Sequence, residues 1–511
     1  MNLIKSTSTF SFYTLISRIL GYLRDLLIAM NLGSGPIADA FFVAFRIPNT
    51  FRRLFSEGTF NAAFVPSYSS ELIKGKGKAK NFANEIFNLL LISLFLIVVI
   101  IEILMPGFVY IIAPGFDENL EKLNLTIYLT RITFPFLLFV SLASFFSAIL
   151  NSHNQFAAAA AAPIILNILL ILVLFYESYL NDNLVIYLSY AVSIAGLIQL
   201  VLLIFYSKNL FFPKFSLIFK IGIKVKIFFK KLLPSIFSSG VTQINILVGT
   251  IIASFQASAV SYLYYADRIY QINLAIAGIA VGTVILPSLS KHIQSKNNKK
   301  INTIQKKALE LSLFLSLPAA LALLIASEEI TSALFGYGSF DQSSVENSAK
   351  ALFAFAFGLP AFCSIKVYTT FLFARHNTKI PFYFSLISVV INILISVSFF
   401  NKFGFIIIPI ATSISALINV FLLRYYLSYK NYFSITLKEY FLGTTFRIIL
   451  SAILTSYIFY NLVNNFAKYL SYESEYKLLT IILLVIATFV IYILISIVTK
   501  AFKTSDIKLK Y

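Results

Sequence analysis

Apolar runs separated by short polar loops follow one another along almost the whole chain, from residue 8 to residue 499. A run of about 20 apolar residues is long enough to cross the hydrocarbon core of a bilayer as a helix. Fourteen such runs are predicted, at 8–30, 37–66, 84–105, 124–150, 157–177, 184–206, 228–255, 258–290, 308–327, 347–374, 380–400, 405–428, 441–463 and 477–499. The runs at 37–66 and 258–290 are longer than a plain crossing needs, so we expect them to tilt, kink or extend into water. The pattern predicts an all-α polytopic membrane protein.

Composition agrees with this class. Hydrophobic residues make up 59% of the chain and charged residues 12%, whereas soluble domains carry about 25% charged residues. The formal charge of +20 does not indicate nucleic-acid binding, because the lysines lie in short loops between apolar runs rather than on one soluble face. Cys363 is the single cysteine, so an intramolecular disulfide is excluded.

Loop charges predict the orientation. Alternate loops carry clusters of basic residues, as at 74–80, 208–231 and 291–307, while the intervening loops are acidic or neutral, as at 117–121 and 328–346. Basic loops face the cytoplasm by the positive-inside rule. Since the number of predicted spans is even, both termini are expected in the cytoplasm.

Short motifs recur in the two halves of the chain. Four pairs match in the same order: Phe45-Arg46-Ile47 with Asp267-Arg268-Ile269, Val65-Pro66-Ser67 with Leu286-Pro287-Ser288, His153-Asn154 with His376-Asn377, and Asn167-Ile168-Leu169 with Asn392-Ile393-Leu394. Six-helix units repeated in one orientation are typical of transporters with a central cavity between two halves. We therefore expect an N-terminal six-helix lobe at 1–206, a basic amphipathic cytoplasmic linker at 207–231, a C-terminal six-helix lobe at 232–430 and two extra helices within 431–511.

Ionisable side chains inside the first, second and eighth runs are the candidate functional residues. A charge at the bilayer centre costs about 3 kcal/mol on insertion scales, so such residues line a polar cavity or form pairs. The arginines exceed the carboxylates by two: Arg18, Arg24, Arg46, Arg52, Arg53 and Arg268 stand against Asp25, Asp39, Glu57 and Asp267. Guanidinium groups contact phosphate through two hydrogen bonds and stay charged when desolvated. A cavity lined by these residues suits a dianion such as pyrophosphate.

Pairing within the protein is the alternative for these charges. Arg24 with Asp25, Asp267 with Arg268, and Arg53 with Glu57 could simply hold helices together, or could form a gate whose partners meet only when one side closes. Asn167 and Asn392 are predicted to bond between helices rather than to contact a ligand.

Three stretches carry a family resemblance: Ser17-Arg18-x-x-Gly21-x-x-Arg24-Asp25, the run from Arg46-x-Pro48-Asn49 through Arg52-Arg53 to Glu57-Gly58, and Tyr264-Tyr265-Ala266-Asp267-Arg268. They resemble the MurJ (MviN) lipid II flippase family of the multidrug/oligosaccharidyl-lipid/polysaccharide exporter superfamily, and the resemblance covers essentially the whole chain. It implies a transporter of the bacterial cytoplasmic membrane. Such a protein moves undecaprenyl-pyrophosphate-linked disaccharide-pentapeptide, the peptidoglycan precursor, from the inner to the outer leaflet by alternating access.

The resemblance also assigns roles to residues. Substrate binding falls to Arg18, Arg24, Arg52, Arg268, Ser17 and Ser261, and gating or ion pairing to Asp25, Asp39, Arg53, Glu57 and Asp267. The two extra C-terminal helices are expected to form a groove for the lipid tail. Lipid II and membrane lipid are the implied partners, with cell-wall synthesis or division proteins as further candidates.

No cofactor or metal is expected. Some relatives place carboxylates in the seventh and eleventh helices as a sodium site. Here the run at 228–255 has no acid, and Ser396 stands one turn after Asn392. Asn392 and Thr412 could still supply oxygens. A hard cation prefers carboxylate ligands, however, so sodium coupling is doubtful.

Two other classes stay open. One is an exporter of drugs or of another lipid-linked glycan, although a drug exporter would favour an acidic, aromatic cavity over an arginine-rich one. The other is a membrane enzyme acting on polyprenyl phosphates, which would need clustered carboxylates for Mg²⁺ or a nucleophile beside an oriented base. The sequence shows no such paired-acid motif.

Overall fold

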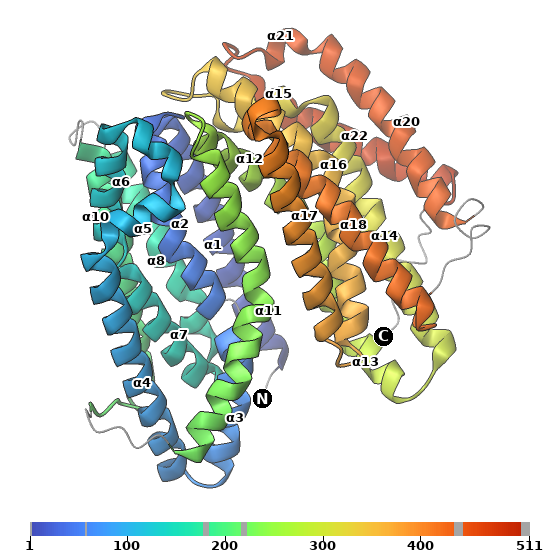
Figure 1. Ribbon diagram of the computed structural model, residues 1–511. Coiled ribbons are helices and arrows are strands. Elements are labelled where there is room, and N and C mark those ends of the chain that lie inside the picture. The colour runs from blue at the N-terminus through green and yellow to red at the C-terminus, as the bar shows by residue number, and fades with distance from the viewer. Residues whose placement is uncertain (1–2, 57–58, 177–182, 216–221, 434–442, 502–511) are drawn as a thin grey trace. The chain divides into compact units, whose positions relative to one another are not determined.

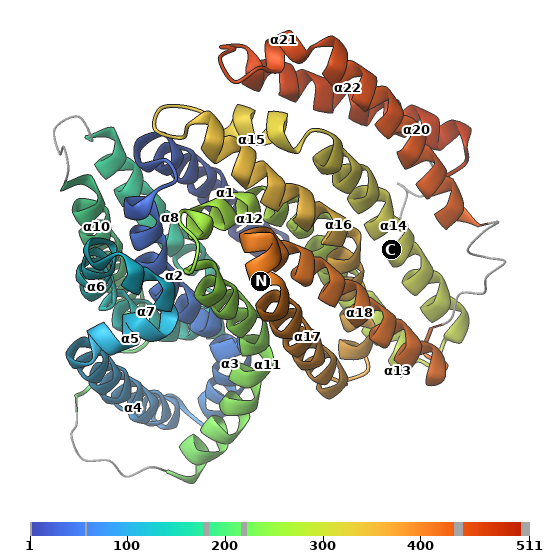
Figure 2. The ribbon, with the colours of Figure 1, turned by 45° about the horizontal axis from the view of Figure 1, so that its top comes forward.

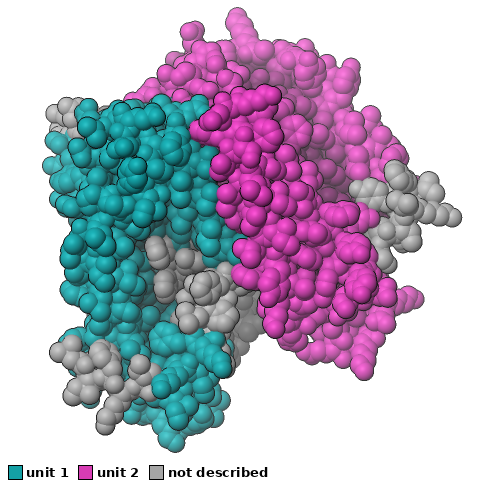
Figure 3. Space-filling model, viewed as in Figure 1, with its two compact units in different colours: residues 1–260 teal, residues 261–511 magenta. Residues whose placement is uncertain are grey.

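A computed structural model of the chain describes residues 3–56, 59–176, 183–215, 222–433 and 443–501, leaving aside the side chains of 3–11, 51–56, 59, 61–62, 231–239 and 242. The described residues are helical or form short connections, and they divide into two compact units, Met1–Val260 and Ser261–Tyr511 (Figure 3).

Unit 1 is built from long helices joined by short turns (Figure 1). Its helices are α1 (Leu3–Leu32), α2 (Pro36–Ser56), α3 (Thr59–Ile73), α4 (Lys76–Ile103), α5 (Met105–Ile112), η1 (Pro114–Glu118), α6 (Leu120–Thr133), α7 (Phe136–Ser152), α8 (Phe156–Phe175), α10 (Leu184–Ser207) and α11 (Ile223–Ala253). The predicted run at 37–66 contains most of α2 and the first part of α3, and residues 57 and 58 between them lie outside the described part of the chain.

Unit 2 has the same long-helix construction. Its helices are α12 (Ala259–Leu274), the π-helical turn η3 (Ala275–Ala280), α13 (Val281–Gln294), α14 (Asn298–Ile325), α15 (Ser327–Phe335), α16 (Gln342–Phe373), α17 (Lys379–Phe403), η4 (Gly404–Ile406), α18 (Ile407–Tyr429), α20 (Thr444–Asn465), α21 (Ala467–Leu470) and α22 (Lys477–Val498). Every run predicted from the apolar pattern contains a helix.

Ten stretches of the described chain are long and apolar enough to cross a membrane. The stretch Lys379–Tyr429 contains both α17 and α18, and α2 is not among the ten. Charge explains why α2 does not qualify, because it carries Asp39, Arg46, Arg52 and Arg53 within 21 residues. The helices α1 and α11 are likewise not among the ten. The predicted all-α polytopic membrane fold is confirmed.

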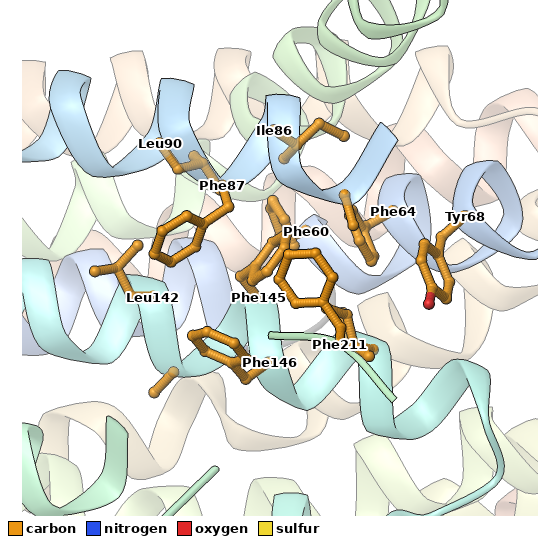
Figure 4. Packing of buried hydrophobic residues seen from close by; sticks show 14 of the residues in the cluster. Phe60, Phe64, Tyr68, Ile86, Phe87, Leu90, Leu142, Phe145, Phe146 and Phe211 are labelled. Atoms are coloured by element: carbon orange, nitrogen blue, oxygen red, sulfur yellow. The ribbon is translucent and has the colours of Figure 1, made fainter. Parts of the chain in front are cut away.

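An aromatic cluster forms the core of unit 1 at the end where α3 and α11 meet (Figure 4). Phe64 of α3 lies 5.2 Å from Phe145 of α7, and Phe60 lies 5.8 Å from Phe228 of α11, measured between ring centroids. Phe211, in the segment before α11, is also buried, 5.7 Å from Phe145. Phe211 and Phe228 therefore pack into the protein, whereas an amphipathic linker helix on the membrane surface would turn such residues toward lipid.

Polar contacts fix the same segment. Glu71 at the end of α3 accepts a hydrogen bond from Lys224 of α11 at 2.5 Å and another from Lys74 at 2.9 Å. These two bonds, Lys224 first, lower the pKa of the Glu71 carboxyl. The contacts with α3 place α11 in unit 1, although the sequence repeat assigns its membrane part to the second lobe.

Two turns in the two units have the same backbone geometry. After α7, Asn154 has φ 62° and the Gln155 amide donates to the Leu150 carbonyl at 2.9 Å. After α16, His376 has φ 58° and the Asn377 amide donates to Leu372 at 3.0 Å. Both are Schellman-type helix ends. The geometry pairs Asn154 with His376, one residue away from the predicted match of His153 with His376. The separation between Asn154 and His376 along the chain equals the separation between Arg46 and Arg268.

Close helix approach in unit 2 depends on small residues. A Cβ at Gly358 of α16 would lie 2.6 Å from the Ser413 hydroxyl of α18, and a Cβ at Gly278 of η3 would lie 3.1 Å from the Cα of Cys363. Cys363 is completely buried at this contact. Glycine lets these helices approach as small-residue interfaces in membranes do.

The pair α20 and α22 lies side by side and is joined to the rest of unit 2 at both ends (Figure 2). The Tyr492 hydroxyl donates to the Phe314 carbonyl of α14 at 2.9 Å. At the other end the ammonium of Lys477 donates to the carbonyls of Gly336 and Tyr472, both at 2.6 Å. Lys477 is buried between the Tyr337 and Tyr472 rings.

Candidate functional site

Charged side chains on α1 meet α8 inside unit 1. Arg24 donates from Nε and Nη2 to Asp25 Oδ1 at 3.0 and 2.6 Å, and from Nη1 to Asn167 Oδ1 of α8 at 2.9 Å. Asn167 in turn donates from Nδ2 to the Ser17 carbonyl at 2.9 Å. Arg24 and Asp25 are buried, with exposed fractions of 6% and 3%. The predicted role of Asn167 as a bond between helices is confirmed.

Glycine makes room for this junction. A Cβ at Gly21 would lie 3.6 Å from Asn167 Nδ2, so α1 passes close to the amide there. The guanidinium of Arg24 also lies 5.8 Å from the centre of the Phe45 ring of α2. Three helices therefore contribute to the surroundings of one buried ion pair.

Arg18 has different surroundings. Its side chain is exposed, and among the described residues none bonds to it. Arg18 and Arg24 are six residues apart on α1, so their Cα atoms are about 9 Å apart along the helix axis. Of the two arginines of α1, Arg24 is thus neutralised and Arg18 is exposed.

Asp39 of α2 is completely buried, with none of its surface exposed. Its Oδ2 accepts from the ammonium of Lys122 of α6 at 2.7 Å and from the Ser258 amide at 3.0 Å. Lys122 also lies 3.7 Å from the centre of the Phe116 ring. Lys122 was missed by the sequence analysis because it lies just before the predicted run at 124–150, where it looks like a loop lysine.

The other arginine of α2 that can be described joins two helices. Arg46 is half-buried and donates from Nη1 to Thr250 Oγ1 of α11. Arg52 and Arg53 belong to α2, but their side chains lie outside the described residues, as does Glu57 altogether.

In unit 2 the candidates lie on α12, before the π-helical turn. Arg268 donates from Nη2 to the Tyr264 hydroxyl at 2.8 Å and stacks over that ring at 4.6 Å. Asp267 accepts from the Gln271 amide, and Ser261 is buried. The ring keeps the guanidinium in one orientation along the helix, since cation–π contact favours this geometry.

The oxygens considered for a sodium ion bond to one another. Asn392 of α17 donates from Nδ2 to Thr412 Oγ1 of α18 at 3.1 Å, and Ser396 donates to Asn392 Oδ1 at 3.0 Å. The predicted interhelical role of Asn392 is confirmed. Across the described ranges, no group of three or more His, Cys, Asp or Glu residues could hold a metal ion.

Lys366 is a further cation within a predicted membrane span, and it is not among the candidate residues predicted from the sequence. Lys366 is half-buried on α16, where its Cγ lies 3.4 Å from the position of a Cβ on Gly278. Its signal was present in the sequence, since it is an ionisable residue within the predicted run at 347–374.

Solved structures of transporters share this fold. One titled "Lipid II flippase MurJ, inward closed conformation" matches with a TM-score of 0.82 and 27% identity, covering 96% of this chain and 98% of that chain. An inward-facing multidrug resistance MATE family transporter of the MOP superfamily matches with a TM-score of 0.64 over 81% and 95% of the two chains, at 14% identity. Fold and intramembrane charges define the class: an all-α, multi-pass membrane transporter rather than an enzyme.

The family follows from sequence. The family model described as "Lipid II flippase MurJ" matches residues 28–481. A Rhizobium tropici protein named "Probable lipid II flippase MurJ" is 42% identical over 411 residues, covering 78% of this chain and 76% of its own length. "Lipid II flippase MurJ" of Burkholderia cenocepacia is 32% identical over 392 residues, 75% of each chain. The chain belongs to the MurJ lipid II flippase family, which confirms the family predicted from its motifs.

Proposed function

We propose that this protein translocates lipid II from the inner to the outer leaflet of the bacterial cytoplasmic membrane by alternating access. The observation that carries the proposal is the match to the lipid II flippase model over residues 28–481. Arginine is the cation at the candidate positions Arg18, Arg24 and Arg268, and guanidinium is suited to a diphosphate.

The contacts within each unit suggest how the roles are divided. Arg24 is bonded to Asp25 and Asn167, so it can take a phosphate only by releasing the Asp25 carboxylate. Arg18 is exposed and needs no such exchange. We therefore assign first contact with the pyrophosphate to Arg18, and contacts formed during transport to Arg24, Arg52 and Arg268, with Ser17 and Ser261 as neighbouring polar groups.

The acids take the gating role in this proposal. Asp25, Asp39, Glu57 and Asp267, together with Arg53, are ion-pair partners that change between states. Asp25 and Asp39 have such partners here, in Arg24 and Lys122. In such a gate, a cationic side chain exchanges its carboxylate partner for the anionic ligand. Its charge therefore stays compensated in both states.

The finer architecture is part of the same proposal. Fourteen spans form two six-helix lobes at 1–206 and 232–430, joined by the linker 207–231, with both termini in the cytoplasm. The matching turns at Asn154 and His376 support the repeat that relates the lobes. The pair α20 and α22, within 431–511, serves as the lipid-tail groove.

Complementation tests the proposal. The full chain is expressed in a bacterium depleted of its own lipid II flippase, and lipid II in the outer leaflet is assayed at matched membrane expression. Wild type is expected to restore growth and outer-leaflet lipid II. Arg18→Ala, Arg52→Ala and Arg268→Ala are each expected to fail, since losing one charge-assisted contact costs about 1.5–3 kcal/mol, or roughly tenfold to a hundredfold in affinity.

Arg131→Ala is the matched control, because Arg131 is an exposed arginine of α6 outside the candidate set. It should behave as wild type. A wild-type chain that inserts correctly yet does not restore outer-leaflet lipid II would point to another exported substrate. Arginine variants that restore growth fully would place the pyrophosphate site elsewhere.

A further inference from the structure

A cavity of about 490 Å³ lies in unit 2 where α15, α16 and η4 with α18 come together. Its walls combine three charged side chains with large apolar ones, the most prominent being Glu328, Glu346, Lys350, Phe353, Phe357 and Ile410. None of these residues belongs to the candidate substrate site, so the cavity needs an explanation of its own.

Polarity changes along the length of this cavity. Glu346, Lys350, Phe353 and Phe357 follow one another on α16 at spacings of four, three and four residues, which places them on one face of the helix. They extend over about 16 Å at 1.5 Å per residue. The face is charged at its first two positions and aromatic at its last two. A ligand that fills it must be polar at one end and apolar at the other.

The apolar end continues onto a surface suited to lipid. Phe353 and Phe357 have exposed fractions of 43% and 56%. On α18 the residues in phase with Ile410 are apolar and exposed as well: Ile414, Leu417 and Phe421 at 39%, 54% and 67%. An exposed apolar ridge on a membrane-spanning helix lies against acyl chains. The cavity is thus continuous at its apolar end with an exposed apolar ridge.

The charged end restricts the headgroup. Within the described part of the chain, Glu328, Glu346 and Lys350 form no ion pair with one another or with other residues. Two carboxylates disfavour a headgroup that is only anionic. A primary amine offers three donors to carboxylates, whereas a quaternary amine offers none. The single ammonium of Lys350 suits one phosphate.

From this match of charge and shape, we propose that the cavity binds a zwitterionic phospholipid with a primary-amine headgroup, such as phosphatidylethanolamine. Its amine lies between Glu328 and Glu346, its phosphate meets Lys350, and an acyl chain follows Phe353, Phe357 and the exposed ridge of α18. This site is independent of the pyrophosphate site and of the proposed transport of lipid II.

Native mass spectrometry and thermal unfolding of the purified full chain in detergent test the site. The probes are phosphatidylethanolamine, phosphatidylcholine and phosphatidylglycerol with identical acyl chains, titrated separately. We expect phosphatidylethanolamine to bind about tenfold more tightly than the other two and to raise the unfolding temperature most, since it alone satisfies both carboxylates and the lysine. Equal binding of the three lipids, or a preference for phosphatidylglycerol, would overturn the proposal.

Variants locate the effect. The double change Glu328→Gln with Glu346→Gln should abolish the preference for the primary amine, and Ile410→Trp should block the cavity while leaving both carboxylates in place. Glu118→Gln, an exposed carboxylate of η1 in unit 1, is the matched control and should keep the preference. Retained preference in both cavity variants contradicts the site. Free phosphoethanolamine that binds as tightly as the lipid would identify a soluble ligand and refute the acyl-chain assignment.

Discussion

The buried pair of Asp39 and Lys122 shows how a single residue in this protein depends on a distant one. The two side chains are 0% and 8% exposed and 2.7 Å apart, yet they are 83 positions apart in the chain. Losing one member of a buried pair leaves the other charge uncompensated in a medium where it cannot be solvated.

Lys122→Met and Asp39→Asn are therefore each expected to destabilise the protein by about 3–5 kcal/mol. The double variant should recover much of this loss, because both charges are then removed together. Thermal unfolding of the purified variants in detergent measures the effect. Single variants as stable as wild type would mean that other groups compensate the remaining charge.

The candidate residues themselves could be predicted from sequence, but their partners could not. An arginine within an apolar run, such as Arg18 or Arg24, stands out by type and position alone. The bond from Arg24 to Asn167 joins residues 143 positions apart, and no local pattern encodes which helix packs against α1. Lys122 resembles a loop lysine until α2 is placed beside α6.

At the scale of elements, the approach of η1 to the end of α11 leaves no space for a side chain. A Cβ at Gly115 would lie 2.4 Å from the backbone nitrogen and Cα of Phe255. The Gly115 amide also donates to the Ser254 hydroxyl at 3.0 Å. Because the obstacle is backbone rather than a flexible side chain, it cannot move away by changing a rotamer.

Gly115→Ala should therefore separate η1 from α11 and lower stability by about 1–3 kcal/mol or more. Gly107→Ala is a matched control, since a Cβ at Gly107 of α5 meets nothing within 4 Å and alanine favours a helix. Unfolding temperatures of the two variants should differ clearly. If Gly115→Ala unfolds at the wild-type temperature, the contact is not as close as described.

The attachment of α11 to α3 is expected to depend on pH. Hydrogen bonds from Lys224 and Lys74 depress the pKa of Glu71 below its ordinary value of 4.5. A carboxyl with a depressed folded-state pKa stabilises the fold above its unfolded pKa, and this contribution disappears as the pH falls through the folded value. The contact should thus be intact at neutral pH and weaken only in acid below 4.5.

Hydrogen exchange of the first turns of α11, from residue 223, measures this. Protection factors, which correct for the slower intrinsic exchange in acid, should fall in wild type as the pH drops below 4.5. Glu71→Gln should exchange faster than wild type at neutral pH and change less with acidification. High salt should also accelerate exchange in wild type, since the lysines are half exposed. A pH response that persists in Glu71→Gln would assign it to another group.

Element positions could be predicted well because apolar length alone determines where a chain can cross a bilayer. Their connections were harder to predict. Phe211 and Phe228 look like lipid-facing residues among lysines until the aromatic cluster of α3 and α7, into which they pack, is known. One of the four matched motifs, His153 with His376, was aligned one residue out of step, because matching letters are weaker evidence than matching backbone geometry.

At the scale of the whole molecule, the chain's last helices depend on one buried lysine. Lys477 reaches two carbonyls and two aromatic rings, although it is the first residue of α22. Its partners include Gly336, at the end of α15, so it connects the pair α20 and α22 to α15.

Lys477→Met should loosen this end of the pair while leaving the contact of Tyr492 with α14 in place. We expect faster hydrogen exchange in α21 and the first turn of α22, with unchanged exchange in α14 and α16. Lys468→Met is a matched control, because Lys468 is an exposed lysine of α21. Uniformly faster exchange over the whole of unit 2 would show that Lys477 supports the entire unit rather than this junction.

The burial of Cys363 between α16 and η3 has a practical consequence for following transport. The protein has one thiol and hides it completely, so maleimide reagents and oxidants should leave the native chain unlabelled. A cysteine introduced on a helix surface would then be the only thiol that reacts with the label, so Cys363 would not need to be replaced first. With one such cysteine in each unit, two spectroscopic labels could be attached. The distance between the labels would then show how the units move during transport.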